Sequence, residues 1–125
     1  MARGSIPASA FNAARGKRKY GNTPTILDGI RFDSVAEANR WSVLRILERT
    51  GHISELKRQV PFGLVVNGVK IGTYKADFAY NDNRTGSQVV EDVKSEATMT
   101  DVYRLKKKLM LALHGIEIVE IIKGR

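Results

Sequence analysis

Short apolar runs alternate with polar turn residues along most of the chain, a pattern that predicts both strands and helices. Residues 26–32 read Ile-Leu-Asp-Gly-Ile-Arg-Phe, with apolar residues on each side of Asp-Gly. Asp-Gly between apolar stretches is a strong signal for the two-residue turn of a β-hairpin. The sequence therefore predicts a small hairpin over residues 26–32.

A helix is predicted directly after this hairpin. Ser34 is of a residue type that favours the start of a helix, and Gly51 is of a type that favours its end. Between them, Trp41, Leu44 and Leu47 recur at helical spacing. We therefore expect a helix between Ser34 and Gly51 with one buried apolar stripe.

Three strands are predicted next, in an antiparallel meander. Residues 54–66 are strand-like and turn at Asn-Gly, residues 67–68, into a second strand over residues 69–80. The polar segment 81–86 forms the next loop, and residues 88–95 form the third strand.

A second helix and a last strand complete the pattern. Thr100 predicts the start of the helix, and His114-Gly115 predicts its end. The predicted inward face of this helix consists of Val102, Leu105, Leu109 and Leu113. The predicted last strand contains Ile116, Ile118 and Ile121. With the hairpin set aside, the order is α-β-β-β-α-β, which predicts an α/β fold of the α+β type with a mixed sheet.

Length and composition restrict the function classes. The chain has 125 residues, which suits one domain, and 42% of them are hydrophobic, enough for a modest core. The absence of cysteine excludes disulfides and thiolate metal sites. No apolar run reaches the roughly 18 residues that a membrane span needs, and the N-terminus has no apolar core of a secretory signal. We expect a cytoplasmic protein that does not contact membranes.

The positive charge is concentrated at the N-terminus. The net charge is +8, and the first twenty residues carry five cations and no acid. We predict that residues 1–22 form a flexible basic arm ahead of a domain over residues 23–125. Basic arms bind nucleic acid through phosphate contacts, although a purely solubilising tail is the alternative. The predicted contact residues of the arm are Arg15, Lys17, Arg18 and Lys19.

Two acids and a lysine in the predicted meander suggest a catalytic site. Asp77 lies in the second strand, and Asp92 and Lys94 lie in the third. A regular hairpin would place Asp77 opposite Val90, so that Asp77, Asp92 and Lys94 share one face of the sheet. A slip of the register by one residue would bring in Glu91 instead of Asp92.

These residue types suit the hydrolysis of phosphodiester bonds. Two carboxylates on neighbouring strands offer the hard oxygen ligands that Mg²⁺ or Mn²⁺ prefers. A lysine on the same face can orient or deprotonate water and stabilise developing negative charge. The alternative is that Asp92 and Lys94 form an ordinary ion pair. The flanking valines, however, predict a central strand, where a charge is costly unless it is paired or used.

Glu37, on the first predicted helix, has two interpretations. The pattern Ser34-x-x-Glu37 is a capping box, in which the glutamate would accept a hydrogen bond from the backbone of Ser34. Glu37 also shares a helix face with Trp41 and Leu44, so that it is placed to be a third metal ligand beside the sheet.

The second helix carries further candidates for nucleic-acid contact. Tyr103 and Lys107 share one side of this helix, and Arg104 adds another cation. The alternative is a solvated basic face. Gln59 is polar beside apolar residues and is expected to hydrogen-bond near the site.

Taken with these motifs, the chain resembles the PD-(D/E)XK nucleases, in particular short phage-encoded endonucleases and enzymes similar to Holliday-junction resolvases. The resemblance covers about residues 20–122, with Asp77 as the first acid, Asp92 and Lys94 as the acid and lysine of the triplet, and Glu37 as the first-helix glutamate. Ala76 stands where the family often has proline.

The resemblance implies a restriction-endonuclease-like αβββαβ core and Mg²⁺-dependent cleavage of DNA, at junctions or flaps in phage recombination or replication. It also allows a homodimer. Three rival interpretations stay open: a non-catalytic nucleic-acid-binding protein, an RNA-directed nuclease, and a nuclease subunit that needs another protein.

Overall fold

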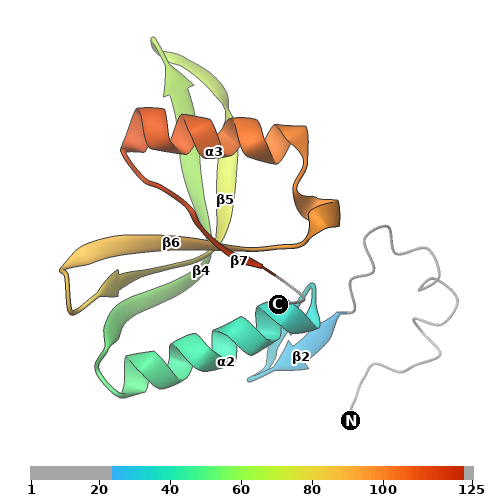
Figure 1. The fold of residues 1–125 in the computed structure, drawn as a ribbon, viewed down its shortest axis with the longest axis vertical. Coiled ribbons are helices and arrows are strands. Elements are labelled where there is room, and N and C mark those ends of the chain that lie inside the picture. Colours follow the sequence, from blue (N-terminus) through green and yellow to red (C-terminus); the bar gives the residue numbers. More distant parts are fainter. Residues whose placement is uncertain (1–23, 123–125) are drawn as a thin grey trace, which may run out of the picture.

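The computed structural model describes residues 24–122 and has a mixed α+β fold (Figure 1). Its elements, in chain order, are β2 (Thr25–Leu27), β3 (Ile30–Phe32), α2 (Val35–Arg49), β4 (Ile53–Val66), β5 (Val69–Asp82), β6 (Ser87–Lys94), a short 3-10 helix (Glu96–Thr98), α3 (Asp101–His114) and β7 (Val119–Ile122). The predicted hairpin and the α-β-β-β-α-β order after it are confirmed. Neither described α-helix has the length and apolarity that a membrane-spanning helix requires.

Both predicted tight turns form as the residue types require. Asp28 and Gly29 have φ of 54° and 74°, and Asn67 and Gly68 have φ of 50° and 80°. A two-residue turn with positive φ at both positions matches the twist of the strands it joins, and Asn, Asp and Gly tolerate it best. These turns pair β2 with β3 and β4 with β5.

The main sheet has the strand order β4-β5-β6-β7. The first three strands are antiparallel, and β7 lies parallel to β6. Parallel neighbours cannot be joined by a tight turn, so α3 serves as the crossover between them. The sheet places Asp92 of β6 beside Glu120 of β7.

The predicted register between β5 and β6 is wrong by two residues. Val90 lies opposite Ala79, and not opposite Asp77 as a regular short hairpin would give. The strands continue further toward the loop than expected, up to the pair Asp82 and Ser87. Because side chains alternate with a period of two, a shift of two residues leaves each side chain on its predicted face.

The two helices pack on separate apolar clusters. Figure 1 shows that α2 and α3 lie against different parts of the main sheet. The cluster under α2 includes Phe78, whereas the cluster under α3 includes the next residue of β5, Ala79. Consecutive strand residues point to opposite faces, so the helices cover opposite faces of the sheet there. Ala76 nevertheless belongs to the same cluster as Ala79, which shows that the alternation along β5 is interrupted at Asp77.

The predicted inward face of α3 is wrong. Val102 and Leu105 are 63% and 57% exposed, and the buried side chains are Tyr103 and Met110. Tyr103 can be buried because its hydroxyl donates a hydrogen bond to Glu120. A stripe of aliphatic residues alone could not anticipate this rotation of the helix. Leu113 is also exposed, and Leu109 packs only partly against the core.

Candidate active site

A polar cleft of about 140 Å³ lies where β6 ends. All of the residues predicted to be catalytic line it: Glu37, Asp77, Asp92 and Lys94. The rest of its wall comes from Asp33, Ser34, Val93, Ser95 and Thr98. The fold thus brings together side chains from α2, β5 and β6 that are up to 57 positions apart in the sequence, the separation between Glu37 and Lys94.

Asp77 and Asp92 meet on the neighbouring strands β5 and β6. Both carboxyl groups line the cleft, and Asp77 Oδ2 accepts a hydrogen bond from Val93 N at 2.8 Å. Burial raises the pKa of Asp77, and the neighbouring carboxyl groups of Asp92 and Glu37 raise it further, whereas the Val93 N–H lowers it. Asp77 therefore keeps its proton to a higher pH than an ordinary aspartate does.

Asp92 is held by a tyrosine and faces the lysine. It is 4% exposed, and its Oδ2 accepts a hydrogen bond from Tyr74 Oη at 2.7 Å. The same oxygen lies 3.5 Å from Lys94 Nζ. Burial first, and then the neighbouring Asp92, raise the pKa of Tyr74, so the phenol remains a donor. Asp92 therefore has a fixed orientation with its charge directed toward Lys94.

Lys94 is steadied by an aromatic ring. Its Nζ lies 3.9 Å from the centroid of the Tyr103 ring, a cation–π contact. Tyr103 is in turn fixed by the hydrogen bond of its hydroxyl to Glu120 at 2.8 Å. The ammonium group is thus held between the Asp92 carboxylate and the ring face, at the wall of the cleft.

Glu37 enters the cleft from the first turn of α2. Its backbone N–H donates to Ser34 Oγ at 3.1 Å, which is the first half of the predicted capping box. Its carboxylate accepts from Gln59 Nε2 at 3.1 Å, and no hydrogen bond from Ser34 N to this carboxylate occurs within residues 24–122. Burial, followed by the charge of Asp33, raises the pKa of Glu37. Its side chain therefore faces the acids of the cleft and does not complete the cap.

The predicted role of Gln59 near the site is confirmed by its bond to Glu37. Gln59 has a φ of 54° and lies between Arg58 and Val60, which pair with Phe78 and Ala76. The irregular backbone of β4 is thus directly across from Asp77. Irregularities of this kind redirect side chains and are common beside functional sites.

Tyr74 is the site residue that the sequence did not reveal. Strict alternation along β5 would place Tyr74 and Asp77 on opposite faces, with no contact to Asp92. The interruption at Asp77 removes this separation and brings the Tyr74 hydroxyl to the Asp92 carboxylate. A tyrosine three residues before a strand aspartate is the only signal for it in the sequence.

Glu91, the alternative acid, is turned away from the cleft. It is 1% exposed and accepts hydrogen bonds from Arg40 and from Tyr80 Oη. Its carboxylate is therefore fully occupied on the face of the sheet that packs against α2. The interpretation in which Glu91 replaces Asp92 in the cleft is wrong.

The donor set fits a hydrated hard cation. Within residues 24–122 no three His, Cys, Asp or Glu side chains already form a cage for a metal ion. Mg²⁺ is usually held by one or two carboxylates and keeps several waters, so a pair of aspartates suffices. Asp77 and Asp92 are the residues that would hold it, and the Glu37 carboxylate in the same cleft offers a further oxygen ligand.

The family model described as "Protein of unknown function (DUF1064)" matches residues 17–123. The chain belongs to the DUF1064 family. No curated protein and no solved structure matches it. The DUF1064 match includes α2, the whole sheet and α3, and so all the residues that line the cleft.

The predicted nucleic-acid contacts of the DUF1064 domain divide into three groups. Tyr103 is 6% exposed and its hydroxyl is occupied, so the expectation that it touches DNA is wrong. Lys107 forms an ion pair with Glu120 at 3.1 Å, and the exposed Arg104 pairs with Asp101 at 3.2 Å. The arm and its predicted contacts lie outside the described residues: Arg15, Lys17, Arg18 and Lys19.

Proposed function

We propose that this DUF1064 protein is a divalent-metal-dependent nuclease of the PD-(D/E)XK type that hydrolyses phosphodiester bonds in DNA. The observation that carries the proposal is that Asp77, Asp92 and Lys94 line one cleft, with Lys94 Nζ 3.5 Å from Asp92 Oδ2. Buried acids with a raised pKa in a concave site are typical of catalytic residues.

Asp77 and Asp92 would hold Mg²⁺ or Mn²⁺, which would supply charge neutralisation at the phosphorus and ease the deprotonation of water. The hydrogen bond from Val93 N fixes the orientation of the Asp77 carboxyl group. Tyr74 Oη does the same for Asp92. The protein thereby presents both acids in a fixed orientation before the substrate arrives.

Lys94 supplies the positive charge of the site. Its ammonium group has Asp92 on one side and the Tyr103 ring on another, so its donors extend into the cleft. There it can donate a hydrogen bond to the attacking water or to a phosphoryl oxygen whose negative charge grows during the reaction. Glu37 adds a third carboxylate to the cleft, which would serve as a further ligand of the cation.

DNA is the proposed substrate for two reasons. The α-β-β-β-α-β order and the positions of Asp77, Asp92 and Lys94 resemble enzymes that cut DNA, and the net charge of +8 favours a polyanion. We also propose that the protein acts in the cytoplasm, because a DNA-cutting enzyme needs access to DNA there. A homodimer is compatible with the proposal but is not required by the cleft.

The test is incubation of the purified chain with supercoiled, linear, flapped and four-way-junction DNA and with a matched RNA, in Mg²⁺, Mn²⁺ or EDTA. We expect cleavage of DNA in either metal and none in EDTA. Asp77→Asn should be inactive, whereas Asp101→Asn, the same change at an exposed acid, should cut like the parent. DNA binding without any cleavage in either metal would replace the nuclease with the non-catalytic binding protein.

A further inference from the structure

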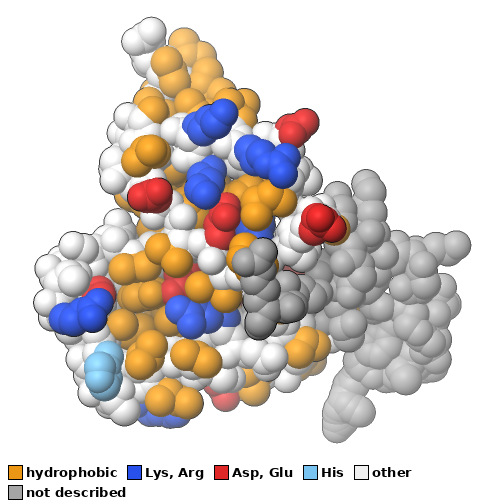
Figure 2. Space-filling view, in the orientation of Figure 1, with side chains coloured by type: hydrophobic (Ala, Val, Ile, Leu, Met, Phe, Trp, Pro, Cys, Tyr) orange, Lys and Arg blue, Asp and Glu red, His pale blue; other side chains and the backbone are white. Residues whose placement is uncertain are grey.

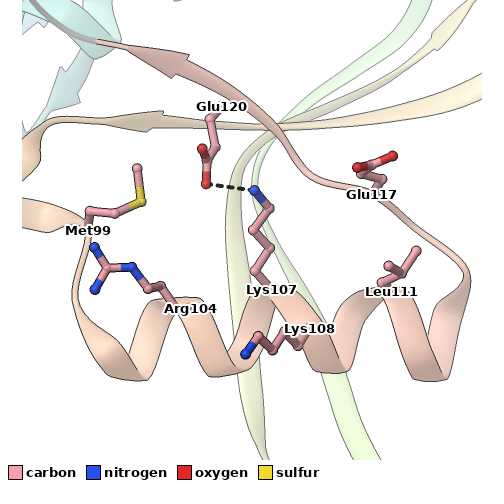
Figure 3. A pocket seen from close by; sticks show the side chains of 7 residues that line it. All are labelled: Met99, Arg104, Lys107, Lys108, Leu111, Glu117 and Glu120. Atoms are coloured by element: carbon pink, nitrogen blue, oxygen red, sulfur yellow. Dashed lines mark hydrogen bonds and ion pairs between the residues drawn. The ribbon is translucent and has the colours of Figure 1, made fainter.

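A second concavity, of about 460 Å³, lies between α3 and β7 (Figure 3). We call it the α3–β7 groove. Met99 and Leu111 give it an apolar surface, and Leu111 is 54% exposed. An apolar surface of this kind beside charged side chains is suited to an amphipathic ligand.

The charges along the groove are only partly paired. Lys107 and Glu120 form an ion pair at 3.1 Å, drawn as a dashed line in Figure 3, so their charges cancel. Lys108 has no ion-pair partner among residues 24–122. The pair between Arg104 and Asp101 is exposed and therefore exchanges easily for another anion. Arg104 and Lys108, both labelled in Figure 3, are thus available to a ligand, and Figure 2 shows Lys and Arg side chains on the surface over α3.

The groove and the catalytic cleft are neighbours that share the side chain of Tyr103 between them. The Tyr103 ring contacts Lys94 of the cleft, and its hydroxyl donates a hydrogen bond to Glu120 of the groove. A strand whose phosphate lies at Lys94 would therefore reach the groove with its adjoining nucleotides.

We propose that the α3–β7 groove binds unpaired nucleotides of the DNA strand next to the phosphate that is cut. This inference rests on the proposed nuclease function. Bases pack on Met99 and Leu111, while Arg104 and Lys108 contact the phosphates. Glu117 offers a carboxylate that accepts a hydrogen bond from the exocyclic amino group of cytosine or adenine.

Glu117 favours a single strand over a duplex in the groove. The backbone of a duplex would place phosphates along the groove, where they would meet the Glu117 carboxylate. Like charges at this range cost free energy. An unpaired strand can instead rotate its phosphates toward Arg104 and Lys108 and its bases toward Glu117 and the apolar surface.

The test compares the binding of a fluorescent duplex that carries a single-stranded flap with a blunt duplex of equal length, by anisotropy in EDTA. We expect the parent to prefer the flap. Leu111→Glu and Lys108→Glu each place a carboxylate in the groove and should weaken flap binding by about tenfold, which corresponds to about 1.4 kcal/mol, and leave blunt-duplex binding within about twofold. Lys70→Glu makes the same charge change at an exposed lysine far from the groove and should reduce binding to both substrates equally.

Failure of this inference is distinguishable from failure of the nuclease proposal. Equal binding of flap and blunt duplex by the parent, or groove variants that behave like Lys70→Glu, would overturn the groove as a nucleotide site even if Mg²⁺-dependent cleavage is seen. Loss of the flap preference in the groove variants supports the site. That result would stand even if no DNA is cut, in which case the groove is a binding site without the adjoining catalysis.

Discussion

Arg40 and Glu91 form a bidentate ion pair, with Nε–Oε1 and Nη2–Oε2 distances of 2.7 and 2.6 Å. Arg40 lies on α2, one turn after Glu37, and Glu91 directly precedes Asp92 on β6. This pair therefore joins α2, which carries Glu37, to β6, which carries Asp92. Glu91 makes this contact on the face of the sheet opposite to that of Asp92.

Arg40→Ala should destabilise the fold because it leaves the Glu91 carboxylate buried without its cation. Breaking a buried pair from one side costs about 3–5 kcal/mol. Urea denaturation followed by circular dichroism measures this change in the free energy of unfolding. Arg31→Ala removes an exposed pair, with Asp33, and should cost less than about 1 kcal/mol. Equal effects of the two variants would contradict a structural role for Arg40.

Asp77→Asn should raise the melting temperature of the metal-free protein while abolishing cleavage. The pKa of Asp77 is raised from its ordinary 3.8, so ionisation is less favourable in the folded than in the unfolded chain. Stability therefore falls as the pH rises above the ordinary value, and at neutral pH an amide avoids this loss. The amide still accepts the hydrogen bond from Val93 N. Thermal melts in EDTA check the sign, and a clear drop in melting temperature would show that Asp77 is an ordinary structural charge.

Mg²⁺ should bind more tightly as the pH rises. The proton on Asp77 must leave when a cation enters, and the raised pKa of Asp77 extends this competition above the ordinary range of a carboxyl group. Calorimetric titrations in two buffers of different ionisation enthalpy should report proton release. An affinity that is unchanged between about pH 5 and about pH 8 would show that these carboxyls do not bind the cation.

Lys94→Ala should reduce turnover by about two to four orders of magnitude, because the lysine acts on the water or the phosphate. The variant should still be stabilised by Mg²⁺, because Lys94 is not a ligand of the metal ion. Single-turnover cleavage and melts with and without Mg²⁺ separate the two effects. Lys70→Ala, at an exposed lysine of β5, serves as the control and should match the parent. A Lys94→Ala variant that cuts at the parental rate would remove lysine from the mechanism.

Glu37→Gln separates the two interpretations of this residue. Glutamine can still accept a hydrogen bond from Gln59 Nε2, and the cap by Ser34 Oγ uses only the backbone N–H of residue 37, so the melting temperature should change little. A role toward the cation predicts a cleavage rate at least about tenfold lower, because a charged oxygen ligand is lost. Parental activity in this variant would leave only the structural role.

The sequence predicted the elements because their signals are local. The turns at Asp28-Gly29 and Asn67-Gly68, and the caps at Ser34 and Thr100, each depend on a few neighbouring residues and all form as expected. Glu37, Asp77, Asp92 and Lys94 were also predictable as a group, since strand alternation survives a register shift of two residues.

What the sequence did not predict depends on contacts between distant segments. The rotation of α3 follows from burying Tyr103 with its hydroxyl on Glu120, which lies on another element. The contact of Tyr74 with Asp92 follows from an interruption of β5 at Asp77 that no local pattern announces. Glu91 likewise pairs with Arg40, which is 51 positions away in the sequence. Because this pair holds Glu91 outside the cleft, Asp92 is the acid of β6 that enters it.

The position of β7 beside β6 has a consequence for protein synthesis. Asp92 and Lys94 are translated well before Glu120, yet Glu120 is the residue that fixes the ring under Lys94. In a nascent chain that has emerged only as far as β6, Lys94 would lack this support. The geometry around Lys94 is therefore complete only after α3 has crossed the sheet and β7 has added to its edge, so that the proposed cleavage of DNA would require the folding of the whole domain.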